Sequence, residues 1–221
     1  MTGAEPARNA CRRPFGDGPA VSLFTLGTMR ALSSADQMRE VLQAAVEAGI
    51  NHLETAPAYG PAEGFLGQGL RALTHNGIQP EGGWVITSKV LPGVSLKDGQ
   101  AQLLACLGRL GVKRLDNWAV HGLNLDEHLH WAIKGEGKAL LDWAQAEGLV
   151  GQVGFSSHGS DALIRAAINS GVFRFCSLHL HLLDPRRMPL AAQALESGLG
   201  VMAISPADKG GRLQDPSPTL V

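Results

Sequence analysis

The sequence predicts an α/β protein built on parallel strands, because two kinds of segment alternate along it. From residue 21 onward, short apolar runs are each followed by a helix-like segment and a glycine-containing turn. The seven runs are residues 21–26, 52–55, 84–90, 117–120, 152–155, 175–180 and 201–204. They start about 23 to 35 residues apart, which is typical of a repeated strand, helix, strand unit. Strands joined in this way run parallel and are buried on both faces.

The segment between the first two runs shows how the sequence marks its helices. Residues 34–37 read Ser-Ala-Asp-Gln, which has the form of a capping box. Apolar residues then recur at helical spacing from Met38 to Val46, and Gly49 supplies the C-terminal cap. Three further helices are predicted at 96–110, 138–147 and 161–170, each followed directly by a glycine.

Two parallel architectures fit this alternation. A doubly wound nucleotide-binding sheet would carry a glycine-rich fingerprint directly after its first strand, and residues 26–31 (Leu-Gly-Thr-Met-Arg-Ala) do not supply it. Residues 67–72 and 198–203 match the fingerprint, but the first lies in a helix-like segment and the second runs into a strand. The sequence therefore favours the (β/α)8 TIM-barrel type, whose chemistry lies at the carboxyl ends of the strands.

Composition excludes several classes of function. Lys and Arg number 19 against 20 Asp and Glu, for a net charge of −1, and neither sign forms the block that binding to nucleic acid or anionic lipid needs. No apolar stretch approaches the roughly eighteen residues of a membrane span. Cys11, Cys106 and Cys176 are too few and too far apart for a disulfide framework or a cysteine-ligated metal cluster. We expect a cytoplasmic protein that binds neither nucleic acid nor membranes.

The chain length is expected to hold one incomplete barrel. Residues 1–20 contain no apolar run, so we expect an extended N-terminal lead-in there and the barrel domain at 21–221. After the seventh strand only 205–221 remain, too few for an eighth strand and two more helices. The predicted barrel is therefore cut short after its seventh strand. Its open edges predict aggregation, complementation by a partner, or disorder in roughly the last fifteen residues.

Four side chains at successive strand ends have the residue types that let a tyrosine act as a proton donor. Tyr59 is the only tyrosine in the chain, and a phenol titrates near pH 10 unless its neighbours tune it. Lys89 can stabilise the phenolate, and Glu54 can hold that lysine. His121 can orient the oxygen of a substrate. Any one of these residues is also compatible with a purely structural role, but the four together indicate a site.

The sixth predicted strand allows a different chemistry. His179 and His181 are two residues apart and share one strand face with Ser177. Together with His121 they can ligate zinc or iron in the mouth of a barrel, as in metal-dependent hydrolases. Glu54 is the main carboxylate near that mouth. A metal-dependent hydrolase stays open as an alternative, as does the structural interpretation that these histidines only line the barrel.

Several segments resemble, in order and at family spacing, those of the aldo/keto reductase family. They are 50–60 (Ile-Asn-His-Leu-Glu-Thr-Ala-Pro-Ala-Tyr-Gly), 86–89 (Ile-Thr-Ser-Lys), 120–121 (Val-His), 153–157 (Val-Gly-Phe-Ser-Ser) and 204–206 (Ile-Ser-Pro). The resemblance implies an NADP(H)-dependent reductase of a small aldehyde or ketone on a (β/α)8 barrel. Tyr59 would be the general acid, with its pKa lowered by Lys89. Glu54 would pair with that lysine, and His121 would polarise the carbonyl.

The resemblance also assigns residues to the cofactor. They are Gly27, Thr28, Ser156, Ser157, Ser177, Ile204 and Ser205. The first two would approach the nicotinamide ribose, and the next two would hydrogen bond the carboxamide. Ser177 stands where the family often has a glutamine for that purpose, Ile204 stands where many members have an aromatic residue, and Ser205 would lie near the pyrophosphate.

Glu54 departs from the pattern of most members, which have aspartate at this place. The surrounding residues are similar to a bacterial branch in which glutamate is usual, and that branch often continues into a C-terminal iron–sulfur domain. The present sequence contains no cysteine cluster of that kind. Because the predicted barrel is incomplete, an inactive barrel that serves as a binding or interaction module is the alternative function.

Overall fold

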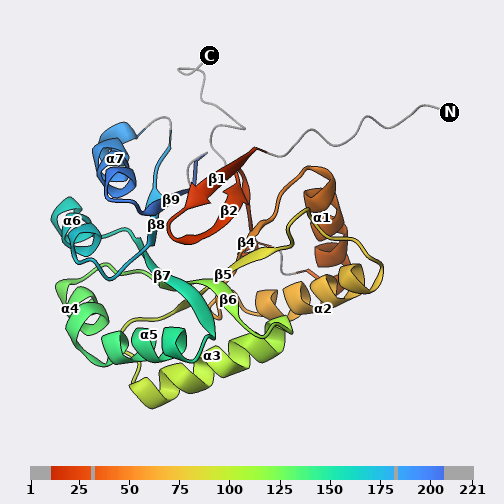
Figure 1. The fold of residues 1–221 in the computed structure, drawn as a ribbon, viewed down its shortest axis with the longest axis horizontal. Helices are drawn as coiled ribbons and strands as arrows, with labels where there is room; N and C mark the ends of the chain where they lie inside the picture. The colour runs from red at the N-terminus through yellow and green to blue at the C-terminus, as the bar shows by residue number, and fades with distance from the viewer. Residues whose placement is uncertain (1–10, 31–32, 182–183, 207–221) are drawn as a thin grey trace.

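The computed structural model describes residues 11–30, 33–181 and 184–206, and its main element is a curled sheet of seven parallel strands (Figure 1). The strands are β3 (Thr25–Gly27), β4 (His52–Glu54), β5 (Val85–Val90), β6 (Leu115–Val120), β7 (Val150–Ser157), β8 (Phe175–His179) and β9 (Gly200–Ile204). Each strand pairs with the next one along the chain. This is the strand order of a (β/α)8 barrel, seven strands of which lie in the described part of the chain. The predicted fold class is confirmed, and the last residues, 207–221, lie outside the described part.

The first predicted strand is displaced in the structure. Residues 21–26 were expected to form one strand, but β2 (Gly18–Ser22) ends inside this run and β3 begins at Thr25. The hydroxyl of Ser22 donates to the carbonyl oxygen of Phe24 at 2.6 Å. This bond closes a bend between the two strands. The apolar run is therefore divided between two sheets, with β2 in a two-stranded sheet and β3 in the seven-stranded sheet.

The predicted lead-in at 1–20 is, in its described part, a β hairpin. β1 (Arg12–Phe15) pairs antiparallel with β2, so the hairpin crosses the boundary that we predicted after residue 20. The exposed residues of its strands are Arg13, Pro14, Pro19 and Ala20, and only Phe15 and Val21 are buried apolar residues. Two inward residues are too few for the sequence to show a strand pattern.

The hairpin packs inside the curl of the sheet, against β6 and β9, at the amino-terminal ends of the strands (Figure 1). The ring of Phe15 lies 5.2 Å from those of His52 and Phe175. Gln152, near the start of β7, donates to the carbonyl oxygen of Phe15 at 2.8 Å and accepts from the backbone N–H of Asp17 at 2.9 Å. The hairpin therefore fills one end of the barrel and leaves the carboxyl ends of the strands for the site.

Helices cover the outer face of the sheet (Figure 1). Those in the described residues are α1 (Ala35–Glu47), α2 (Ala62–His75), α3 (Leu96–Leu110), α4 (Asp126–Lys134), α5 (Glu136–Ala146), α6 (Asp161–Asn169), α7 (Met188–Glu196) and the 3-10 helix η1 (Pro185–Arg187). The predicted cap is present, since the hydroxyl of Ser34 accepts from the backbone N–H of Gln37 at 3.1 Å. None of the helices described is long and apolar enough to cross a membrane.

Two apolar clusters divide the interior. The larger lies between the sheet and the helices and includes Leu53, Trp118 and Phe155. The smaller lies inside the curl around Phe15 and Phe175. Buried polar side chains also lie inside the barrel. His52, Thr87, Asn117 and Gln152 form hydrogen bonds in the amino-terminal halves of the strands. Glu54 and Lys89 are buried near the carboxyl ends, where the site was predicted.

His52 lies inside the barrel with no exposed surface. Its ring nitrogens are each 2.8 Å from a threonine hydroxyl, Nδ1 from that of Thr25 and Nε2 from that of Thr87. Burial lowers the pKa of His52 from 6.5 to about 4, because a charged imidazole loses its hydration there. The folded chain therefore holds this ring neutral in mildly acidic solution.

We predict that His52→Gln reduces the acid sensitivity of the fold. The folded-state pKa of His52 lies below the unfolded value, so its contribution to stability is full above about pH 6.5 and is lost as the pH falls toward 4. Between pH 7 and 5 the loss is about 2 kcal/mol. Urea unfolding at both pH values measures this. The decrease in the free energy of unfolding from pH 7 to pH 5 should be smaller in the variant by about that amount. An equal loss in both proteins would contradict it.

Candidate active site

The carboxyl ends of β4, β5 and β6 bring the four predicted catalytic side chains together. Glu54 ends β4, Lys89 lies one residue before the end of β5, and His121 directly follows β6. Tyr59 lies on the turn between β4 and α2. Because neighbouring parallel strands end at the same edge of the sheet, residues up to 67 positions apart in the sequence become neighbours.

Lys89 is the centre of this cluster and is only 3% exposed. Its ammonium group donates to the Oε1 atom of Glu54, to the carbonyl oxygen of Thr55 at 3.0 Å and to the hydroxyl of Tyr59 at 2.9 Å. Three acceptors match the three hydrogens of an ammonium group. Burial lowers the pKa of Lys89 from 10.5 to about 7, so this lysine can give up its proton near neutral pH.

Glu54 forms the anionic side of the cluster and is 8% exposed. The longer glutamate side chain reaches Lys89 directly, as its expected pairing requires. Its Oε1 atom also accepts a long hydrogen bond, 3.4 Å, from the hydroxyl of Tyr59. A buried ion pair of this kind offsets the desolvation of each partner only while both are present.

Tyr59 and His121 face each other at the open end of the cluster. Their rings are 5.7 Å apart and meet edge to face. Burial, and to a smaller extent the positive charges of Lys89 and His158, lower the pKa of His121 from 6.5 to about 4. The imidazole is therefore neutral at pH 7, with one N–H to donate. Burial raises the pKa of Tyr59. The decrease in this pKa that we expect from Lys89 therefore opposes the effect of desolvation.

Two of the serines predicted to bind the cofactor lie side by side on β7 and β8. Ser156 and Ser177 are paired in register. The hydroxyl of Ser177 is buried and has no hydrogen-bond partner among the described residues. The hydroxyl oxygen of Ser156 accepts from the backbone N–H of Gly122 at 3.0 Å, which leaves its hydrogen to donate. A buried hydroxyl without a partner is costly, and this pair fits an amide group placed beside it.

Ser157 and Thr28 are engaged within the protein. Ser157 donates to the carbonyl oxygen of Leu123 at 2.5 Å and accepts from the backbone N–H of Gly159 at 3.0 Å. The hydroxyl of Thr28 donates to that of Thr55 at 2.9 Å. Both side chains are fully buried, and their hydrogen bonds hold together the chain segments at the ends of the strands. Their predicted contacts with a cofactor stay predictions.

The remaining predicted cofactor residues lie at the two edges of the sheet. Gly27 ends β3, and a side chain there would come within 3.7 Å of Glu54. Ile204 ends β9 and packs against the small apolar cluster inside the barrel. Ser205 follows it with a positive φ of 55°, a conformation that is uncommon outside glycine and often occurs at functional turns.

His179 and His181 do not form a metal site with His121. Their rings lie 5.0 Å apart, and the ring of His179 lies 5.9 Å from that of His158. In residues 11–30, 33–181 and 184–206 no three His, Cys, Asp or Glu side chains are arranged to hold a metal ion. The structure therefore gives the metal-dependent hydrolase no support.

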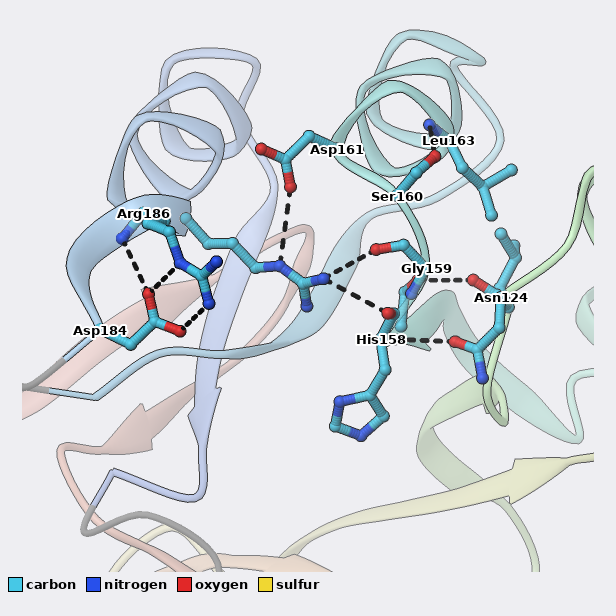
Figure 2. Close-up of polar contacts among 11 residues, drawn as sticks. Asn124, His158, Gly159, Ser160, Asp161, Leu163, Asp184 and Arg186 are labelled. Atoms are coloured by element: carbon cyan, nitrogen blue, oxygen red, sulfur yellow. Dashed lines mark hydrogen bonds and ion pairs between the residues drawn. The ribbon is translucent and has the colours of Figure 1, made fainter.

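Beside these histidines is a polar cavity of about 300 Å³, lined by His158, Asp161, His179, Asp184, Arg186 and Arg187. Figure 2 shows how its cations are held. Arg186 forms an ion pair with Asp184 at 2.6 Å. Arg187 donates to the carbonyl oxygens of His158 and Gly159 at 3.3 and 2.7 Å. This arginine joins the chain after β8 to the loop after β7, a role that its position in the sequence did not indicate.

The geometry defines a class of protein, the parallel strand–helix barrels that carry a tyrosine and a lysine at the carboxyl edge of the sheet. The chain belongs to the aldo/keto reductase family, whose family model matches residues 23–216. All the segments that resemble this family, from residue 50 to residue 206, lie in the part of the chain that the family model matches.

Individual relatives agree with this assignment. The chain is 25% identical to aldo-keto reductase AKR2E4 of Bombyx mori over 205 residues and 28% identical to an aldo-keto reductase of Mycolicibacterium vanbaalenii over 199 residues. Each alignment covers 86% of this chain, which spans 64% and 65% of the length of these curated relatives.

Solved structures share the fold. A candidate aldo-keto reductase of Pseudomonas aeruginosa has a TM-score of 0.77 at 27% identity, with 94% of this chain and 82% of that chain covered. The Bombyx mori AKR2E4 structure, solved in complex with NADP, has a TM-score of 0.73 at 24% identity, with 90% and 67% covered.

We predict that Lys89→Met destabilises the fold more than the double variant Lys89→Met/Glu54→Gln. The single change leaves a buried carboxylate without its cation, which costs about 3 kcal/mol or more, whereas removal of both charges leaves no such charge. Urea unfolding at pH 7 measures both. Asp142→Asn is the control: it removes the carboxylate of an exposed ion pair with Lys138, so it should lower the free energy of unfolding by less than about 1 kcal/mol. Equal losses in the single and double variants would contradict the prediction.

Proposed function

We propose that this chain reduces an aldehyde or a ketone with NADPH and that Tyr59 gives a proton to the carbonyl oxygen. The observation that carries the proposal is the simultaneous contact of Lys89 with Glu54, Thr55 and Tyr59. Membership of the aldo/keto reductase family supports an oxidoreductase acting on a small carbonyl compound. The NADP complex of the Bombyx mori relative supports the choice of cofactor.

The described residues fit a nicotinamide cofactor. When bound, it supplies the hydride, which no protein side chain can supply. The unpartnered hydroxyl of Ser177 and the available hydrogen of Ser156 would hold its carboxamide. Ser157, next to Ser156 on β7, is proposed to complete this side of the site. Gly27 and Thr28 are proposed to approach the cofactor from the β3 edge of the sheet, and Ile204 and Ser205 from the β9 edge.

The proton step follows from the contacts around Tyr59. After Tyr59 gives its proton to the carbonyl oxygen, the phenolate accepts the hydrogen bond from Lys89, which is 2.9 Å away. With a pKa near 7, Lys89 can pass a proton to that phenolate. Glu54 balances the charge of Lys89, and the neutral His121 can donate its N–H to the same carbonyl oxygen.

We also propose that the protein works in the cytoplasm. Cys11, Cys106 and Cys176 are all free thiols in the structure, which suits a reducing compartment.

We predict that Tyr59→Phe lowers kcat for NADPH-dependent reduction of an aromatic aldehyde by about 100-fold or more, because general acid catalysis contributes that much. The ring and its packing stay, so NADPH binding should be retained. Quenching of Trp84 and Trp118 fluorescence by NADPH measures the binding. His75→Gln, at the far end of α2, is a control that should keep the wild-type rate.

Full activity in Tyr59→Phe would contradict the proposed role of the phenol. If the fluorescence of the wild-type protein does not respond to millimolar NADPH, the reductase proposal itself fails and a binding or interaction module is the better assignment.

A further inference from the structure

A buried carboxylate lies behind the candidate active site, on the outer side of β5. Glu63, in the first turn of α2, is 1% exposed. Its Oε1 atom accepts from the hydroxyl of Ser88 at 2.7 Å and from the thiol of Cys106 at 3.0 Å. Its Oε2 atom accepts from Nε of Arg109 at 2.8 Å and forms an ion pair with Nη2 of the same guanidinium at 2.7 Å. Both oxygens are thus fully engaged.

These partners connect three elements. Glu63 belongs to α2, Ser88 to β5, and Cys106 and Arg109 to α3. Ser88 directly precedes Lys89, and successive residues of a strand point to opposite faces of the sheet. The side chain that binds Glu63 and the side chain at the centre of the candidate site are therefore carried by neighbouring residues of one strand.

Glu63 is also tied to Tyr59 through the backbone. The N–H of Ala62 donates to the carbonyl oxygen of Tyr59 at 3.2 Å, and the N–H of Tyr59 donates to that of Ala56 at 3.0 Å. Pro61, at the N-cap of α2, makes no side-chain capping bond. A tight turn therefore leads from Tyr59 into α2, and the Glu63 carboxylate contacts β5 through the hydroxyl of Ser88.

We infer that Glu63 is a positioning residue, which holds Tyr59 against Lys89 by binding Ser88 of the strand that carries this lysine. The inference rests on the proposed function of Tyr59 as the proton donor. Well-packed apolar side chains stabilise a fold as well as a buried ion pair does, so stability alone does not require a carboxylate here. A directed contact to Ser88 fixes the relative position of helix and strand, which packing alone leaves less defined.

The titration of the tyrosine phenol can be assigned to Tyr59 directly, because Tyr59 is the only tyrosine of the chain. The ionisable groups that face it are Glu54 on β4, Lys89 on β5 and His121 after β6. Burial raises its pKa above 10.0. A phenol released from this place would titrate closer to 10.0, whether or not the chain turns over a substrate.

The test compares Ser88→Ala with Cys106→Ala. Both remove one donor to the same oxygen of Glu63, but only the first removes the bond to β5. Glu63→Gln is a third variant that weakens all the contacts. The phenolate absorbance after a rapid jump to alkaline pH gives the pKa of Tyr59, and circular dichroism confirms that each variant is folded.

We expect Ser88→Ala and Glu63→Gln to move the pKa of Tyr59 toward 10.0. Both variants should also lower kcat by about 10-fold or more, because a small displacement of a catalytic group slows the reaction. KM should stay within about twofold of the wild-type value. Cys106→Ala should leave the pKa and kcat unchanged. An unchanged pKa of Tyr59 in Ser88→Ala, or an equal shift in Ser88→Ala and Cys106→Ala, would overturn the inference. A wild-type protein without reductase activity would overturn the proposed function, while the titration would still decide whether Glu63 positions Tyr59.

Discussion

The buried contact between Lys89 and Glu54 is the interaction on which the rest of the site depends. Removing two opposite charges from water costs several kcal/mol for each. Here the cost is offset by the close pairing and by the hydrogen bonds that Lys89 donates to Thr55 and Tyr59. The same burial brings the pKa of Lys89 to about 7. The proposed proton donor, Tyr59, therefore lies beside a lysine that titrates near neutral pH.

The fold makes this burial possible by dividing the inside of the barrel. The hairpin of β1 and β2 fills the amino-terminal end with Phe15 and its apolar neighbours, and His52 stays neutral above them. Glu54 and Lys89 lie near the opposite end of the barrel, at the carboxyl ends of β4 and β5. On the outer side of β5, Glu63 ties the beginning of α2 to the same strand, so the tyrosine and the lysine are fixed from both faces of the sheet.

Much of the fold could be predicted from the sequence because its signals are local. Strand lengths, the Ser34 cap and the glycines that end helices depend on neighbouring residues, and the order of Glu54, Tyr59, Lys89 and His121 shows the site once strands are assumed parallel. The hairpin was missed because its inward residues are only Phe15 and Val21.

Other features depend on contacts that no local pattern reveals. The engagement of Ser157 and Thr28 within the protein follows from carbonyl and hydroxyl groups on neighbouring strands. The same holds for Arg187, which binds the carbonyl oxygens of a loop 28 and 29 residues away. A sequence does not show whether such a residue binds a ligand or forms a hydrogen bond within the protein. The two roles can be distinguished only once the fold is known.

The pKa of the Lys89 ammonium tests this account most directly. Nitrogen-15 NMR of the lysine side chains can follow it, with the resonance assigned by its absence in Lys89→Met. We expect a titration near pH 7. A pKa close to 10.5, the ordinary value of a lysine in water, would contradict the claim that a desolvated Lys89 supplies Tyr59 with its proton.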